Sequence, residues 1–191
     1  MVTVLITGLP KSGSGRMEVI KEDFKTEVCS NIPKYPLKVE KAAGSMWKDG
    51  KLTICGGYRS LSDDYRSECY SLENGEWILN SDQLKTARES HAASNIGNRI
   101  FITGGWNGQT YSLASTEIVH PDGKITQGPK LPQDRWRHCQ ISYEQNTFII
   151  GKSMFCCKKH VYSKGPSIKD VSSEGEGGGY EKLKIQETTK A

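Results

Sequence analysis

The sequence predicts an all-β fold built from repeated units of four short strands. An apolar, β-branched run that stops at glycine occurs four times in the 191 residues, and its matched isoleucines are Ile6, Ile54, Ile102 and Ile149. Their spacings are 48, 48 and 47 residues. Within each unit, strong turn formers separate further short apolar runs, which is typical of antiparallel hairpins. The period and the turns together define the repeating unit.

The unit that spans residues 89–127 shows the expected order most clearly. Turns are expected at Gly97-Asn98 and at Pro121-Asp122-Gly123, because these residues favour the backbone angles of tight turns. Between and around them we expect four strands, at Glu89–Asn95, Arg99–Thr103, Ser115–Val119 and Lys124–Gln127.

Two further landmarks repeat with the same period. A glutamate in the third strand recurs as Glu18, Glu68 and Glu117, at spacings of 50 and 49 residues. An Arg-x-x-His sequence recurs at 88–91 and at 135–138, a spacing of 47 residues. We interpret the glutamates as structural acceptors for backbone N–H groups or for the repeated arginines. The glycine doublets are interpreted as strand ends that need positive φ and a close approach between units.

A period of about 50 residues with four strands per unit, glycine doublets and Trp77 in a fourth strand resembles the kelch-repeat family. That resemblance implies a β-propeller of four-stranded antiparallel blades. It also implies a partial propeller, since complete ones have about 4–8 blades and only two units here are complete. The blades are expected at roughly 1–34, 35–83, 84–130 and, in part, 131–151.

Residues 152–191 depart from the repeat, and we expect a mostly disordered C-terminal tail there. Its segment 172–179 is low in complexity and rich in glycine. An alternative for residues 154–162 is a further strand of the fourth blade. The propeller segment, 1–151, carries a net charge of +1 and the tail +3.

This charge distribution lacks the clustered basic patch that nucleic-acid binding needs. No apolar run reaches the roughly 18 residues that span a bilayer, so we expect no membrane partner. The cysteines lack paired CxxC spacing, and we expect neither a metal site nor a cofactor. The compartment stays open: cytoplasmic as the chain stands, or extracellular if sequence is missing upstream.

Two features point weakly to enzymes. The glycine-rich loop Thr7–Arg16 resembles a sulfotransferase-type Pro-Lys-Ser-Gly loop and, loosely, a Walker A loop. The matching loops after Gly57 and Gly105 carry no such motif, which favours a simple hairpin loop. His91 and His138 occupy matched repeat positions, which favours a structural role over the copper chemistry of galactose-oxidase-like propellers.

Cys55 and Cys69 lie in the second and third strands of one unit, symmetrically about the loop between them. Antiparallel pairing would make them cross-strand neighbours within reach of a disulfide. The alternative is a pair of buried free thiols, which are common in protein interiors.

The leading functional prediction is a non-catalytic protein-interaction module with no catalytic residues. Kelch modules often recruit substrates or act as scaffolds, so the resemblance implies a protein partner. The alternatives are a fragment of a galactose-oxidase-like or phosphate/sulfate-loop enzyme, or a truncated product with little independent function. Aromatic and polar residues in the loops after the glycine doublets are the candidate binding surface. They are Tyr58, Arg59, Tyr65, Trp106, Asn107 and Tyr111.

Overall fold

A computed structural model describes most of the chain, and all of its described secondary structure is strand. The described residues are 3–6, 17–20, 26–28, 32–109, 112–151, 159–162 and 168–171. Side chains are described for 32–109 and 112–151. Tyr111, the glycine-rich loop 7–16 and most of the expected tail lie outside these ranges. None of the described elements is a helix long and apolar enough to cross a membrane.

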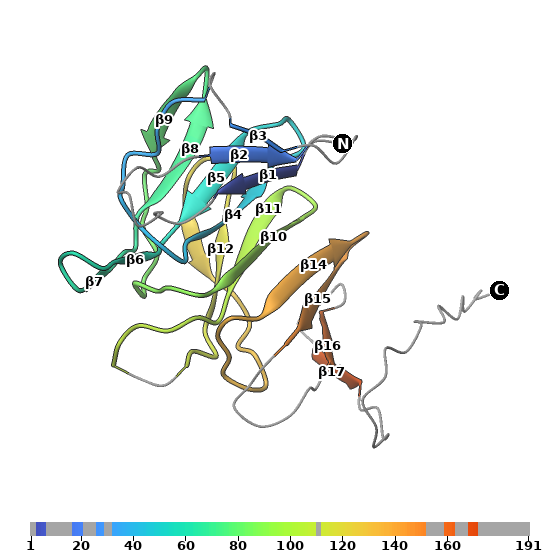
Figure 1. The fold of residues 1–191 in the computed structure, drawn as a ribbon. Helices are drawn as coiled ribbons and strands as arrows, with labels where there is room; N and C mark the ends of the chain where they lie inside the picture. Colours follow the sequence, from blue (N-terminus) through green and yellow to red (C-terminus); the bar gives the residue numbers. More distant parts are fainter. Residues whose placement is uncertain are drawn as a thin grey trace.

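The strands form successive antiparallel sheets in chain order, which confirms the all-β prediction (Figure 1). The first sheet contains β1 (Thr3–Ile6), β2 (Met17–Ile20) and β3 (Thr26–Val28). The second contains β4 (Ala43–Met46), β5 (Leu52–Cys55), β8 (Cys69–Glu73) and β9 (Glu76–Leu79). The third contains β10 (Ala92–Ile96), β11 (Arg99–Thr103), β12 (Thr116–Val119) and β13 (Ile125–Gln127).

A fourth sheet contains β14 (Cys139–Tyr143), β15 (Asn146–Ile150), β16 (Lys159–Tyr162) and β17 (Ile168–Val171). Its last two strands extend this sheet beyond residue 151. We call the four sheets blades 1 to 4. In blade 3 the four expected strands all form, and each boundary lies within three residues of the expected one.

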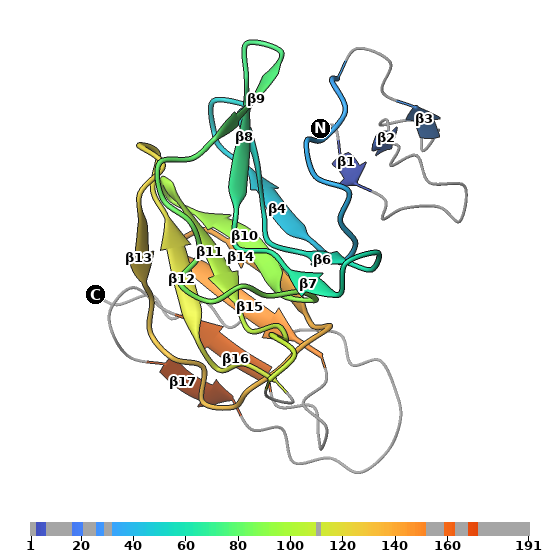
Figure 2. The same cartoon turned by 90° about the vertical axis from the view of Figure 1, so that its left-hand side faces the viewer.

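Blades 2, 3 and 4 meet along their first strands, so that β4, β10 and β14 lie side by side. The later strands of each blade spread outward from this line (Figure 2). Because side chains alternate between the faces of a strand, each blade presents one set of residues to the blade before it and another to the blade after it. In β11, Ile102 joins a cluster with Cys55 of blade 2, whereas Thr103 hydrogen-bonds His138 at blade 4.

The glycine doublets allow this close approach, as the sequence predicts. Gly104 has a φ of 59° and Gly105 a φ of 102°, both in the left-handed region that favours glycine. A Cβ on Gly104 would collide with the carbonyl oxygen of Arg135 and approach Cε1 of His138. In blade 2, a Cβ on Gly56 would likewise collide with the carbonyl oxygen of Arg88 and approach Cε1 of His91. The repeated His therefore packs against the first glycine of the preceding blade.

Two repeated arginines, Arg88 and Arg135, form backbone hydrogen bonds with the preceding blade. The Arg88 carbonyl accepts the Gly57 N–H at 2.8 Å, and the Arg135 carbonyl accepts the Gly105 N–H at 2.7 Å. The fully buried Arg88 guanidinium also pairs with the buried Glu117 carboxylate at 2.7 Å. The predicted role of Glu117 as an acceptor is thereby confirmed.

Candidate binding surface

The loops after the two described glycine doublets present aromatic rings on neighbouring blades. In blade 2 the loop forms a small hairpin of β6 (Tyr58–Arg59) and β7 (Asp64–Tyr65), which projects from the sheets in Figure 1. In blade 3 the loop begins with Trp106. Both loops leave their blade at the same end of β5 and β11, so their rings lie near each other.

Three rings from these loops and one from the segment before β14 contact one another in succession, and we call them the aromatic ladder: Tyr58, Tyr65, Trp106 and Trp136. The ring centroids of Tyr58 and Tyr65 are 5.1 Å apart, and those of Tyr65 and Trp106 are 5.8 Å apart. Trp106 and Trp136 follow at 5.9 Å. These separations lie within the range of favourable aromatic pairs. All four side chains are half-buried, so each keeps part of its ring accessible.

A cation stands at each end of the ladder. The Arg137 guanidinium lies 4.3 Å from the Trp136 ring centroid, and Lys41 Nζ lies 5.1 Å from that of Tyr58. Both distances fall within the reach of cation–π attraction. Lys41 Nζ is also 2.7 Å from the buried Glu89 carboxylate, whereas Arg137 is exposed.

Backbone bridges between segments fix the ladder in place. Tyr58 and Glu40 exchange two backbone hydrogen bonds of 2.8 Å, and Trp106 and Glu89 exchange two of 2.9 Å. Each bridge links the loop after one doublet to the segment that precedes a blade's first strand. The positions of Tyr58 and Trp106 are therefore set by backbone contacts within their own blades rather than by the loops alone.

Local contacts hold the hairpin in one conformation. The Tyr58 hydroxyl donates to the Asp63 carboxylate at 2.6 Å, and Asp63 has a left-handed φ of 51°. This hydrogen bond raises the pKa of Tyr58 to about 12, so the phenol stays protonated at neutral pH. On the blade 3 side, a Cβ on Gly108 would lie 2.5 Å from the Tyr65 ring, which shows how closely the two loops pack.

Of the six residues that the sequence singles out, three meet in the ladder: Tyr58, Tyr65 and Trp106. Arg59 is half-buried, and its Nε has no hydrogen-bond partner among the described residues. The Asn107 side chain accepts the Gln109 N–H at 3.1 Å and so shapes its own turn. Tyr111 lies outside the described residues.

Trp136, Arg137 and Lys41 complete the surface, and sequence reasoning missed them. Trp136 and Arg137 lie inside the 135–138 landmark, where they served only to mark the period. A signal was present, because Trp136 and Arg137 are adjacent before a predicted strand, and aromatic and arginine side chains are enriched in protein interfaces. Lys41 occupies the repeat position that matches Arg137, two blades earlier.

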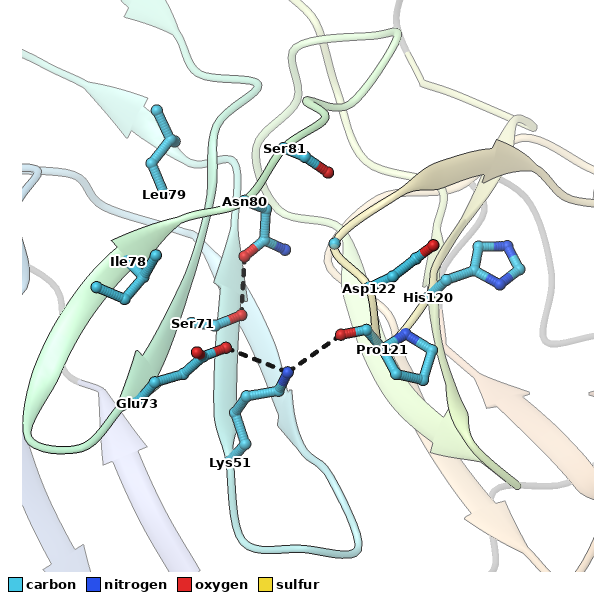
Figure 3. A pocket seen from close by; sticks show the side chains of 11 residues that line it. Lys51, Ser71, Glu73, Ile78, Leu79, Asn80, Ser81, His120, Pro121 and Asp122 are labelled. Carbon is cyan, nitrogen blue, oxygen red and sulfur yellow. Dashed lines mark hydrogen bonds and ion pairs between the residues drawn. The ribbon is translucent and has the colours of Figure 1, made fainter.

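A second candidate is a cavity of about 250 Å³ between blades 2 and 3 (Figure 3). The Lys51 ammonium projects into it but is tied to the Glu73 carboxylate at 3.3 Å and to the Pro121 carbonyl at 3.3 Å. The Asn80 amide oxygen accepts from Ser71 at 2.8 Å. The charged side chains that line this cavity are already paired within the protein. The cavity therefore indicates a ligand class less clearly than the aromatic ladder does.

The fold and its glycine, Arg and His landmarks define a protein built from β-propeller blades of the kelch type. The family model described as "Kelch motif" matches residues 87–139, which include all of blade 3. The chain therefore contains a kelch motif, as the sequence predicts. The kelch motif indicates a protein-interaction module.

Two curated relatives share this similarity. The spermatocyte protein spe-26 of Caenorhabditis elegans is 24% identical over 137 residues, which cover 68% of this chain and 23% of that protein. Kelch-like protein 26 of Danio rerio is 29% identical over 110 residues, which cover 56% of this chain and 18% of that protein. The chain thus spans less than a quarter of the length of these relatives.

Proposed function

We propose that the protein is a non-catalytic interaction module that binds a protein partner through the aromatic ladder and its flanking cations. The carrying observation is the continuity of the ladder: rings from three blades contact one another at centroid distances of 5.1 to 5.9 Å. Aromatic and arginine side chains dominate the binding energy of protein interfaces when they cluster in this way.

Preorganisation supports the same proposal. The ladder rings are held by backbone bridges, by the Tyr58–Asp63 hydrogen bond and by mutual contact, so binding orders few side chains. A surface that loses little conformational entropy retains more of its interaction energy as affinity. The kelch family is generally non-enzymatic, which agrees with an interaction role.

The test uses a phage library that displays segments of natural proteins, selected against the full-length chain. Dissociation constants of selected peptides are then measured by calorimetry for the wild type, Trp106→Ala and the control Thr126→Ala. Thr126 is exposed on β13, away from the ladder. For a central aromatic anchor we expect a loss of about 2 kcal/mol, or about 30-fold in affinity.

The control should bind within about twofold of the wild type, since surface substitutions away from an interface change little. Peptides whose affinity is equal for the wild type and Trp106→Ala would show that binding occurs elsewhere and would overturn the proposal. Amide NMR spectra of each variant establish that the blades remain folded.

A further inference from the structure

The base of the blade 2 loop is closed covalently. Cys55 is the last residue of β5 and Cys69 the first of β8, and the two are direct partners in the strand register. The structure joins them in a disulfide, with Cα atoms 4.1 Å apart and a sequence separation of 14. The whole hairpin that carries Tyr58 and Tyr65 lies inside this covalent loop.

Blade 3 shows how the same position looks without a crosslink. Its matched register pair is Thr103 and Thr116, which precede and follow the loop that begins with Trp106. The Thr103 hydroxyl contacts His138 at 2.8 Å, and the Thr116 hydroxyl donates to the Pro129 carbonyl at 2.6 Å. A covalent bond therefore closes the base of the blade 2 loop, whereas the two matched side chains of blade 3 form their hydrogen bonds with other residues.

The disulfide also lies in the layer between blades 2 and 3. Cys55 is 1% and Cys69 0% exposed, and both join the apolar cluster that includes Trp47 and Ile102. Two sulfur atoms that are no longer bonded must separate to van der Waals contact. Since this layer is close-packed, that separation displaces the neighbouring side chains or the ends of β5 and β8.

We propose that Cys55–Cys69 is a redox-modification site, and that its cleavage by a dithiol loosens residues 56–68 and separates Tyr58 and Tyr65 from Trp106. One thiolate of the dithiol attacks a cysteine sulfur and forms a mixed disulfide, and its second thiolate releases the protein. The disulfide gains two electrons and two protons, and the dithiol leaves as its own disulfide. Because both sulfurs are buried, the attack requires transient separation of blades 2 and 3. Any consequence for partner binding rests on the function proposed above.

Peptide mapping first establishes the bond. Trypsin separates Cys55 in peptide 52–59 from Cys69 in peptide 67–85, each with a single cysteine, so only a disulfide keeps the two linked. We expect the linked pair from the non-reduced full chain and its loss after dithiothreitol treatment. Recovery of both cysteines as alkylated free thiols from the air-oxidised chain would overturn the proposal.

Amide hydrogen exchange then measures order in the full chain with and without dithiothreitol. We expect exchange in residues 58–65 to accelerate about tenfold, while β11 and β12 stay within twofold, because local opening precedes global unfolding. The double variant Cys55→Thr/Cys69→Thr copies the threonine pair of blade 3 and should exchange like the reduced chain. The control Cys139→Ser changes an exposed free cysteine and should exchange like the oxidised chain.

Unchanged exchange in 58–65 after reduction, or equal acceleration in every segment, would overturn the proposal. If the double variant fails to fold, reduction of the wild type still decides the matter. The two proposals also fail separately. Loss of binding in Trp106→Ala with redox-insensitive exchange would reject only the redox site, and the converse pattern would reject only the binding role of the ladder.

Discussion

The layers on the two sides of blade 3 are built from different chemistry. The layer toward blade 2 is built around an apolar cluster, which contains the Cys55–Cys69 disulfide together with Trp47, Ile100 and Ile102. Two buried polar side chains on the same face of blade 2, Thr53 and Ser71, hydrogen-bond each other at 2.8 Å. The layer toward blade 4 is instead built around a chain of polar side chains that hydrogen-bond one another, made of His138, Thr103, Gln140, Ser94 and Ser142.

The backbone frame around the two layers is nevertheless the same. In both layers a doublet glycine donates to an arginine carbonyl, and a buried histidine packs against the preceding glycine. The comparison indicates that the shared backbone contacts set the spacing between blades. The side chains between the blades can then be either apolar or polar. The polar solution requires that each buried group find a partner.

The largest expected effect comes from opening the apolar layer. Ile102 is fully buried in the cluster, and Ile102→Ala should lower the free energy of unfolding by about 2–5 kcal/mol through lost burial and a residual cavity. Urea unfolding followed by fluorescence measures this loss.

The matched control for this change is Ile150→Ala. Ile150 ends β15 with 44% of its surface exposed, and we expect a change of about 0.5 kcal/mol or less. Equal losses in the two variants would mean that burial in the layer between blades 2 and 3 does not stabilise the fold, and the comparison would fail.

A smaller effect is expected in the polar layer. Thr103 is 2% exposed, and its hydroxyl lies 2.8 Å from His138 Nε2 and donates to Gln140 Oε1 at 2.5 Å. Thr103→Val keeps the shape but leaves the buried His138 and the half-buried Gln140 without this partner, which costs about 1–3 kcal/mol. Urea unfolding again provides the measurement.

Thr126→Val is the control, since its side chain is exposed and a β-branched residue is retained. A Thr103→Val variant as stable as the wild type would show that the hydrogen-bonded chain is dispensable. In that case the two layers would differ in composition but not in how specifically they are built.

The sequence predicts the backbone contacts that the blades share better than it predicts the side chains that pack between them. The glycine doublets and the Arg-x-x-His landmark report backbone needs that every blade shares, so periodicity reveals them. Cys55 and Thr103 occupy matched positions, yet nothing local distinguishes an apolar layer from a polar one there. That choice depends on which side chains the next blade brings, such as Gln140.

The ladder shows the same limit. Tyr58, Tyr65 and Trp106 could be predicted because they follow the doublets, where loops open on one face. Trp136 precedes a strand, and it lies beside Trp106 where the neighbouring Arg135 carbonyl accepts the Gly105 N–H. Periodicity supplies the spacing along the chain but not this contact between blades.

The smallest expected effect is a pH dependence that both layers share. Burial lowers the pKa of His91 to about 3 and that of His138 to about 4, with Arg88 and Arg135 respectively adding to the effect. An unfolded histidine titrates near 6.5, so below this pH the unfolded chain binds more protons than the folded chain. The free energy of unfolding should therefore be highest above pH 6.5 and fall as the pH decreases toward 4.

Between pH 6.5 and 5.5 each histidine should contribute a loss of about 1 kcal/mol, which urea unfolding at several pH values can measure. His138→Gln should remove about half of this slope. Ile150→Ala serves again as the control and should leave the slope unchanged, because it removes no titratable group. In His138, Nε2 faces the Thr103 hydroxyl and the buried Nδ1 has no acceptor among the described residues, so protonation has no favourable site. A wild-type stability that is flat from pH 7 to 5.5 would contradict this account of the buried histidines.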